Sequence, residues 1–167
     1  AMACLSSRFP YGTAVTADGL KKVDRAEAFL HNELGYAQVR SRHHDYLARI
    51  ELPVQDLEAL LSNETQCHQT ADALQAIGYT HVTVDLRGFR SGSMNEVLLS
   101  IDVNDAPLFE RLDPILTRHQ LAPAAFEERD QMLYLRLKNP STMADSTLRQ
   151  AVINSCEALG FRYIALD

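Results

Sequence analysis

The stretch ALQAIGYTHVTVD, residues 73–85, recurs near the end of the chain as SCEALGFRYIALD, residues 155–167. In each copy a helical pattern ends at a glycine, and a run rich in β-branched and aromatic residues follows, as is typical of a buried strand. A second pair of matching stretches, DYLARIEL at 45–52 and DQMLYLRL at 130–137, occurs in the same order. Two ordered matches indicate an internal duplication, in which each copy is one structural unit.

Around these matches the first copy reads as αββαβ. Its expected elements are a helix at 16–35, strands at 37–44 and 47–52, a helical stretch at 54–77 broken near residue 62, and a strand at 79–86. The second copy is expected to contain a strand at 97–103, a helix at 105–120 that Pro114 should kink or split, strands at 123–128 and 132–137, a helix at 145–159 and a strand at 161–166. We expect Leu86 and Leu166 to occupy equivalent buried positions.

The second copy therefore has the order βαββαβ, which is the split βαβ pattern of ferredoxin-like folds. We predict an α+β fold of two tandem ferredoxin-like units. The expected domains are an arm at 1–15, a first unit at 16–96 and a second unit at 97–167. The first unit lacks an obvious first strand, and an incomplete sheet has an open edge that proteins cover or pair. We therefore expect a homo-oligomer, or an arm that folds back onto the first unit and supplies its missing strand, which would leave a monomer.

The composition of the chain argues against several classes of protein. The chain has 167 residues, 46% of them hydrophobic and 23% charged, with a formal net charge of −6. This balance argues against a general nucleic-acid or membrane-surface binder. Its three cysteines stand at no metal-ligand spacing and predict neither a disulfide framework nor a zinc site. No apolar run reaches the roughly 18 residues of a membrane span, so we expect a cytoplasmic protein.

The two copies differ most in charge. Arg40 and Arg42 alternate along one strand and share a face, where two guanidinium groups suit a phosphate clamp. The alternative is a solvated strand face with cross-strand ion pairs to Glu51 or its neighbours. The aligned residues of the second copy are Ala125, Glu127 and, opposite Glu51, Arg136. The second copy thus keeps the apolar residues expected in the core of the first copy, but it does not keep the charged ones.

A second informative stretch, residues 87–96, follows a buried strand. Arg87 and Arg90 could hold an anion there, because ligand loops lie at the carboxyl ends of strands. The other candidate residues of this loop are Ser91, Gly92, Ser93, Asn95 and Glu96. The alternative is a linker between the units, since glycine and serine are typical of linkers.

Three ordered blocks resemble one known family. ACLSSRFPYGT at 3–13 resembles the cysteine motif of the ATP-dependent sacrificial sulfur transferases of the LarE family, which act in nickel-pincer cofactor synthesis. VRSRHHDYLARIE at 39–51 and VTVDLRGFRSGSMNE at 82–96 resemble two further blocks of the same family. The resemblance covers about residues 3–96. The expectations for residues 97–167 rest mainly on the internal repeat.

The resemblance implies a definite chemistry. In that family a PP-loop domain adenylates a carboxylate of a pyridinium mononucleotide, and the motif cysteine forms a thioester with it. Elimination then leaves dehydroalanine and a thiocarboxylate. Carried onto this chain, Cys4 is the catalytic sulfur donor, and Glu51 is an acidic catalytic partner that could also bind a metal. Arg40 and Arg42, with Arg87 and Arg90, would hold the substrate phosphate.

One departure limits the resemblance. The family's Ser-Gly-Gly-x-Asp-Ser loop for ATP is absent from these 167 residues. We therefore expect a fragment, a split subunit or a relative without adenylation, with no cofactor of its own. ATP and magnesium would bind a separate PP-loop partner, and the chain alone should not turn over the mononucleotide. The alternative function is a non-catalytic binding or assembly module that retains the fold.

Overall fold

The structure is a computed structural model that describes residues 4–10, 12–90, 108–129 and 132–167. The first unit contains the 3-10 turn η1 (Leu5–Arg8), α1 (Ala17–Asn32), β1 (Arg40–His44), β2 (Leu47–Glu51), α2 (Val54–Leu61), α3 (Glu64–Ile77) and β3 (His81–Asp85). The second contains α4 (Leu108–Arg118), β4 (Pro123–Arg129), β5 (Met132–Leu137), the 3-10 turn η3 (Pro140–Ala144), α5 (Ser146–Ala158) and β6 (Tyr163–Leu166). The predicted α+β class is confirmed.

Helix boundaries follow the expected end signals. The Thr16 hydroxyl accepts a hydrogen bond from the Gly19 amide at 3.0 Å and begins α1. The break near residue 62 is confirmed, because the Asn63 side chain caps α3 separately from α2. Gly78 ends α3 with a φ of 117°, a conformation that glycine adopts without strain. Pro114 lies inside α4 and does not split it. The strand expected at 97–103 lies outside the described residues.

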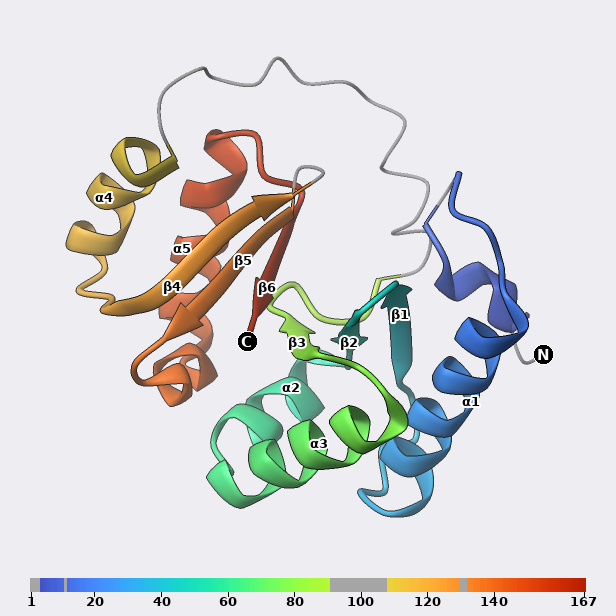
Figure 1. Cartoon of the computed structure of the whole chain (residues 1–167). Helices are drawn as coiled ribbons and strands as arrows, with labels where there is room; N and C mark the ends of the chain where they lie inside the picture. The colour runs from blue at the N-terminus through green and yellow to red at the C-terminus, as the bar shows by residue number, and fades with distance from the viewer. Residues whose placement is uncertain (1–3, 11, 91–107, 130–131) are drawn as a thin grey trace.

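All described strands join one six-stranded sheet of order β1-β2-β3-β6-β5-β4. In each unit an antiparallel hairpin is followed by a parallel strand: β1 with β2 and then β3, and β4 with β5 and then β6. The two units meet where β3 and β6 pair antiparallel. Helices α1 to α3 gather around β1 to β3, and α4 and α5 lie beside β4 to β6 (Figure 1). This mixed sheet is consistent with two tandem ferredoxin-like units.

The strand register matches the two units residue by residue. Ile50 pairs with Val84 in the first unit, and Leu135 pairs with Leu166 in the second. Val84 and Leu166 also pair with each other across the β3–β6 junction. Val84 is therefore the counterpart of Leu166, and the expectation that Leu86 fills this role is wrong by two residues. The junction lies on a pseudo-two-fold axis of the sheet.

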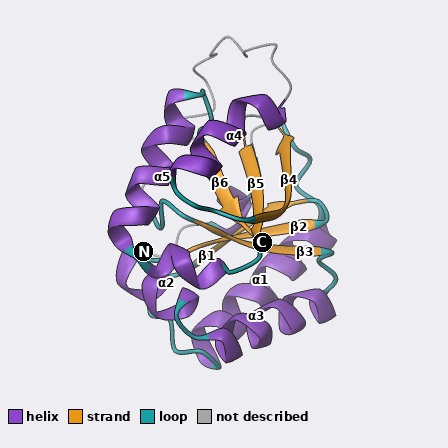
Figure 2. Cartoon of the chain, turned by 90° about the vertical axis from the view of Figure 1, so that its left-hand side faces the viewer, coloured by secondary structure: helices purple, strands orange, loops and turns teal. Residues whose placement is uncertain are grey.

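The sheet has an apolar face and a polar face. Apolar residues from strands of both units share one buried core with residues of the helices: Ile50, Val84, Leu135 and Leu166 with Leu30, Leu74, Val152 and Ile153. Side chains alternate along a strand, so the intervening residues point to the other face: Arg49, Glu51, Asp85 and Tyr134. Figure 2 shows the helices from the side of the second unit. The helices thus cover the apolar face and leave the charged residues on the opposite one.

Over its described residues the arm folds back onto the first unit as the turn η1 and not as the missing strand. Phe9 is buried against the His43 ring, with the ring centroids 4.8 Å apart, and against Gly19 of α1. Phe9 is thus buried within its own chain, and the homo-oligomer stays a prediction. None of the helices within the described ranges has the length and apolar character needed to cross a membrane.

Candidate functional site

Cys4 stands exposed at the start of η1, where the chain turns toward α1 and β1. Its carbonyl oxygen accepts hydrogen bonds from the Ser7 amide at 3.0 Å and from the Ser7 hydroxyl at 2.8 Å. The Cys4 Sγ lies 3.0 Å from the Ser6 hydroxyl oxygen. Several hydrogen bonds therefore hold the backbone of this cysteine while its thiol remains open to solvent.

The surroundings of Cys4 favour its thiolate. The pKa of Cys4 is lowered from 9.0 mainly by hydrogen bonds from the Ser6 side chain and from the Ser6 backbone, with a smaller contribution from the charge of Arg8. A thiolate, and not a thiol, is the nucleophile in cysteine chemistry. The Cys4 sulfur is therefore exposed to a substrate, and its surroundings favour the nucleophilic thiolate form.

Arg8 anchors the turn to the first unit. Its Nε donates to Glu27 Oε1 at 2.7 Å and its Nη2 to Glu27 Oε2 at 3.0 Å, a two-pronged ion pair between η1 and α1. Glu27 Oε1 also accepts a hydrogen bond from the Ser41 amide of β1 at 3.0 Å. One carboxylate therefore ties together the turn, the first helix and the edge strand.

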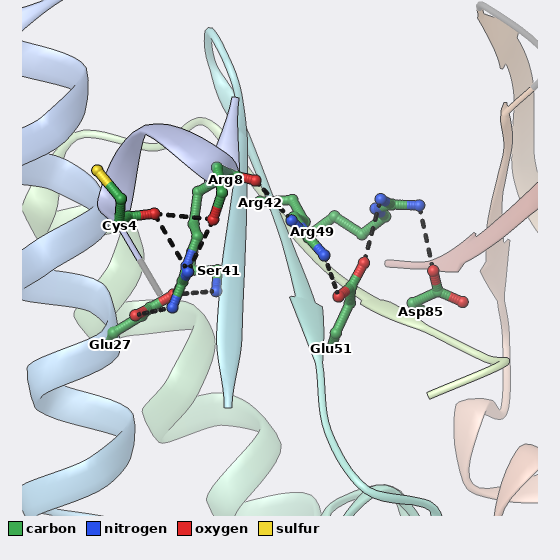
Figure 3. A network of polar contacts seen from close by, with 9 residues as sticks. Cys4, Arg8, Glu27, Ser41, Arg42, Arg49, Glu51 and Asp85 are labelled. Carbon is green, nitrogen blue, oxygen red and sulfur yellow. Dashed lines mark hydrogen bonds and ion pairs between the residues drawn. The ribbon is translucent and has the colours of Figure 1, made fainter. Parts of the chain in front are cut away.

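Arg42 links the turn to a row of buried charges on the polar face of the sheet. Its Nη1 donates to the Ser7 carbonyl oxygen at 2.7 Å, and its Nη2 to Glu51 Oε2 at 3.0 Å. Arg49 donates to Glu51 Oε1 at 3.3 Å and to Asp85 Oδ2 at 3.1 Å. Figure 3 shows these contacts in a line from Cys4 to Asp85. The cross-strand ion pair named as the alternative for Arg42 is present, although it is buried and not solvated.

The four side chains of this row (Arg42, Glu51, Arg49 and Asp85) are at most 2% exposed. Burial raises the pKa of Asp85, while the Arg49 charge acts in the opposite direction. Such a row is costly to desolvate and stays stable because each charge has a partner. Glu51 lies between two guanidinium groups, which compete with any cation for its oxygens. Within the described ranges, no three His, Cys, Asp or Glu side chains are grouped as a metal site requires.

Arg40 shares the face of Arg42 but has a different environment. Its guanidinium carbon lies 4.4 Å from the centroid of the Phe89 ring, and the residue is partly exposed. The pKa of Arg40 is lowered by burial first and then by the neighbouring charges of Arg42 and Arg8. A bound anion would therefore stabilise the charged form of Arg40.

Arg87 and Arg90 line a cavity of about 320 Å³ beside α5. Arg87 donates to the Arg162 carbonyl oxygen at 2.6 Å and forms an ion pair with Glu157 of α5. Its backbone amide donates to Asp85 Oδ1 at 2.9 Å, and the Arg90 charge also acts on Asp85. The remaining predicted loop residues lie outside the described part of the chain: Ser91, Gly92, Ser93, Asn95 and Glu96.

Sequence reasoning missed four members of this arrangement: Arg8, Glu27, Arg49 and Asp85. Arg8 lies inside the cysteine motif, and Asp85 is the last residue of a buried strand, so both carried a usable signal. Glu27 carried one as well, because it is at helical spacing with the buried Val23 and Leu30, and an acidic side chain on the apolar face of a helix needs a partner.

No family model matches the chain. Two curated proteins are similar over part of it. Over 98 residues, 59% of this chain, it is 44% identical to an uncharacterized protein of Synechocystis sp.. Over 95 residues, 56% of this chain, it is 46% identical to the pyridinium-3,5-bisthiocarboxylic acid mononucleotide synthase of Lactiplantibacillus plantarum. The matches cover 36% and 33% of those proteins, so the chain spans about a third of their length. The chain is therefore a partial homologue of a LarE-type mononucleotide synthase.

Proposed function

We propose that this chain is the sulfur-donor portion of a LarE-like sulfur transferase. The observation that carries the proposal is the exposed Cys4, whose pKa is lowered and whose turn is fixed by Arg8 and Arg42. The 46% identity to a mononucleotide synthase supports the same chemistry. The proposed substrate is a pyridinium carboxylate mononucleotide.

The proposed reaction has two stages. The Cys4 thiolate attacks the carbonyl carbon of an adenylated carboxylate, and AMP leaves as the thioester forms. A base then removes the proton on the Cys4 Cα, and the Cβ–Sγ bond breaks. The electrons of that bond leave with sulfur, which yields a thiocarboxylate product and a dehydroalanine at position 4. The chain is consumed in a single turnover.

Activation is assigned to a separate PP-loop domain that binds ATP and magnesium. Adenylation is needed because a thiolate does not displace oxide from a free carboxylate. Arg40 is the first candidate for the substrate phosphate, since an anion would relieve the crowding of positive charge around it. Arg87 and Arg90 are further candidates at the neighbouring strand end.

Arg42 and Glu51 have a different proposed contribution. Both terminal nitrogens of Arg42 already donate to protein oxygens, one of them the Ser7 carbonyl beside Cys4. Arg42 and Glu51 are therefore proposed as positioning residues for the Cys4 turn. An Arg40→Ala variant should weaken mononucleotide binding, whereas Arg42→Lys should chiefly change the alkylation rate of Cys4.

The test is a single-turnover assay of thiocarboxylate formation. The full chain is mixed with a PP-loop protein, magnesium ATP and a pyridinium carboxylate mononucleotide. We expect about one product per chain at most, and none from Cys4→Ser or without ATP. Equal product from Cys4→Ser contradicts the proposal. Tight binding of the PP-loop protein without any product indicates the non-catalytic assembly module instead.

A further inference from the structure

The second unit carries its own version of the charged site, at positions fixed by strand register. Arg40 and Arg42 pair with Glu51 and Arg49 in the first unit, and Ala125 and Glu127 pair with Arg136 and Tyr134 in the second. The counterparts of Arg40, Arg42, Arg49, Glu51 and Asp85 are thus Ala125, Glu127, Tyr134, Arg136 and Asp167. These two sets occupy equivalent places on the helix-free face of the sheet.

All five second-unit counterparts line one open cavity of about 190 Å³. The rest of its wall comes from both units: Tyr46, Leu47, His81, Thr83, Phe126 and Leu135. The cavity lies at the amino ends of β2 and β3, whereas the row from Arg42 to Asp85 lies toward their carboxyl ends. It is therefore a separate place from the Cys4 site.

In the first unit, side chains occupy the equivalent space. There the Arg49 guanidinium carbon lies 4.1 Å from the centroid of the Tyr163 ring, and Tyr163 is the counterpart of His81. In the second unit Tyr134 stands in place of Arg49, and Ala125 in place of Arg40. The loss of these two long cationic side chains accounts for the cavity.

The charge of the site is inverted between the units. Arg40, Arg42 and Arg49 against Glu51 and Asp85 give a formal charge of +1, whereas Arg136 against Glu127 and Asp167 gives −1. Arg136 forms an ion pair with Asp167. The Glu127 carboxylate is exposed and has no ion pair within the described part of the chain. The second site therefore offers one uncompensated negative charge beside aromatic rings.

We propose that this cavity binds a small monocyclic aromatic cation. Rings of Tyr46 and Tyr134 in its wall supply the faces that attract a cation, and Glu127 supplies the opposite charge. A cavity of about 150 Å³ is enough to hold a benzene ring, so about 190 Å³ accommodates one ring with a short charged substituent. This inference does not rest on the proposed sulfur transfer, because the two sites are separate.

Three probes of matched shape test the inference: benzylammonium, benzyl alcohol and benzoate. Each is titrated into the full chain labelled with nitrogen-15, and the amide shifts of Leu47, His81 and Thr83 are followed. Benzylammonium should bind at least about tenfold more tightly than benzoate. Glu127→Gln should remove about that factor for benzylammonium and leave benzyl alcohol unchanged. Glu110→Gln, an exposed change of equal charge on α4, should alter neither.

Three results overturn the inference. Benzoate binding as tightly as benzylammonium would mean that Arg136 governs the site. Equal weakening of benzyl alcohol by Glu127→Gln would mean that the charge of Glu127 is not what selects the ligand. No shift at Leu47, His81 or Thr83 with any probe at millimolar concentration would mean that the cavity is not a ligand site.

Discussion

The three cysteines differ in what surrounds their sulfur atoms. Burial raises the pKa of Cys67, and it raises the pKa of Cys156 to about 12. Cys4 is exposed, and its pKa is lowered by Ser6. At neutral pH the thiolate form is therefore concentrated at Cys4, which is the property a sulfur donor needs before it meets an activated carboxylate.

Ser6→Ala should slow alkylation of Cys4 by iodoacetamide at neutral pH by about two- to fivefold. The change removes the hydroxyl that stabilises the thiolate, so the pKa of Cys4 rises toward its ordinary value of 9.0. The rate at high pH, where every thiol is ionised, should stay the same. Ser62→Ala is the control, since the Ser62 hydroxyl donates to the Glu58 carbonyl oxygen at the end of α2 and makes no hydrogen bond to Cys4. An unchanged pH profile in Ser6→Ala would refute this assignment.

Glu51→Gln should destabilise the protein by about 3–5 kcal/mol. The change removes the carboxylate that pairs with both buried arginines, Arg42 and Arg49, and leaves Asp85 as the acidic group of the row. The free energy of unfolding in urea measures the effect. Glu110→Gln, on the exposed surface of α4, should change it by no more than about 0.5 kcal/mol. Equal values for the two variants would show that the buried row does not depend on Glu51.

His43 should make stability depend on pH. Burial lowers its pKa below 6.5, so the folded state binds a proton at His43 less tightly than the unfolded state does. The contribution of neutral His43 is present above about pH 6.5 and is lost as pH falls through its lowered pKa. His43→Gln should flatten urea stability between about pH 7.5 and about pH 5, and His68→Gln, at an exposed site, should not. Parallel curves for wild type and His43→Gln would contradict this.

At the scale of elements, the arm is held by one aromatic residue and one ion pair. Phe9 is 5% exposed and lies against Gly19, where an added Cβ would come within 2.9 Å of its ring. The Arg8–Glu27 pair holds the other side of η1. The position of Cys4 therefore depends on packing at α1 and β1, several residues away from the thiol.

Phe9→Ala should cost about 3 kcal/mol of unfolding free energy, since a buried ring leaves a cavity. Phe109→Ala is the matched control, because Phe109 is 58% exposed, and it should cost less than about 1 kcal/mol. Phe9→Ala should also speed proteolysis before Thr13 relative to the rest of the chain. A loss no greater than that of Phe109→Ala would mean that the arm is not packed as described.

Local patterns predicted the elements well and the tertiary polar contacts poorly. Thr16 and Asn63 are capping residues whose effect is confined to one helix turn, so their signals could be read from the sequence. The pairing of Arg42 with Glu51 was foreseen only as an alternative. The two-residue repeat of a strand predicts which face of the sheet a side chain lies on, but it does not predict which residue the side chain contacts. The Arg49–Asp85 contact joins residues 36 positions apart and depends on the parallel pairing of β2 with β3.

At the scale of the molecule, duplication explains how one sheet carries two unlike sites. Val84 and Leu166 meet at the pseudo-two-fold axis, and the apolar face is continuous across it. The polar faces have diverged: Arg42 became part of a buried row beside Cys4, whereas Glu127 borders an open cavity. Core positions are constrained by packing in both units, while each polar face is free to acquire its own chemistry.

The mass of the protein itself tests the central claim, that Cys4 gives up its sulfur, most directly. The full chain is incubated with a PP-loop protein, magnesium ATP and a pyridinium carboxylate mononucleotide, and then digested for peptide mass spectrometry. The account predicts a loss of about 34 Da, the mass of hydrogen sulfide, confined to the peptide that contains Cys4. Thiocarboxylate product without that loss, or with the loss at Cys67 or Cys156, would contradict it.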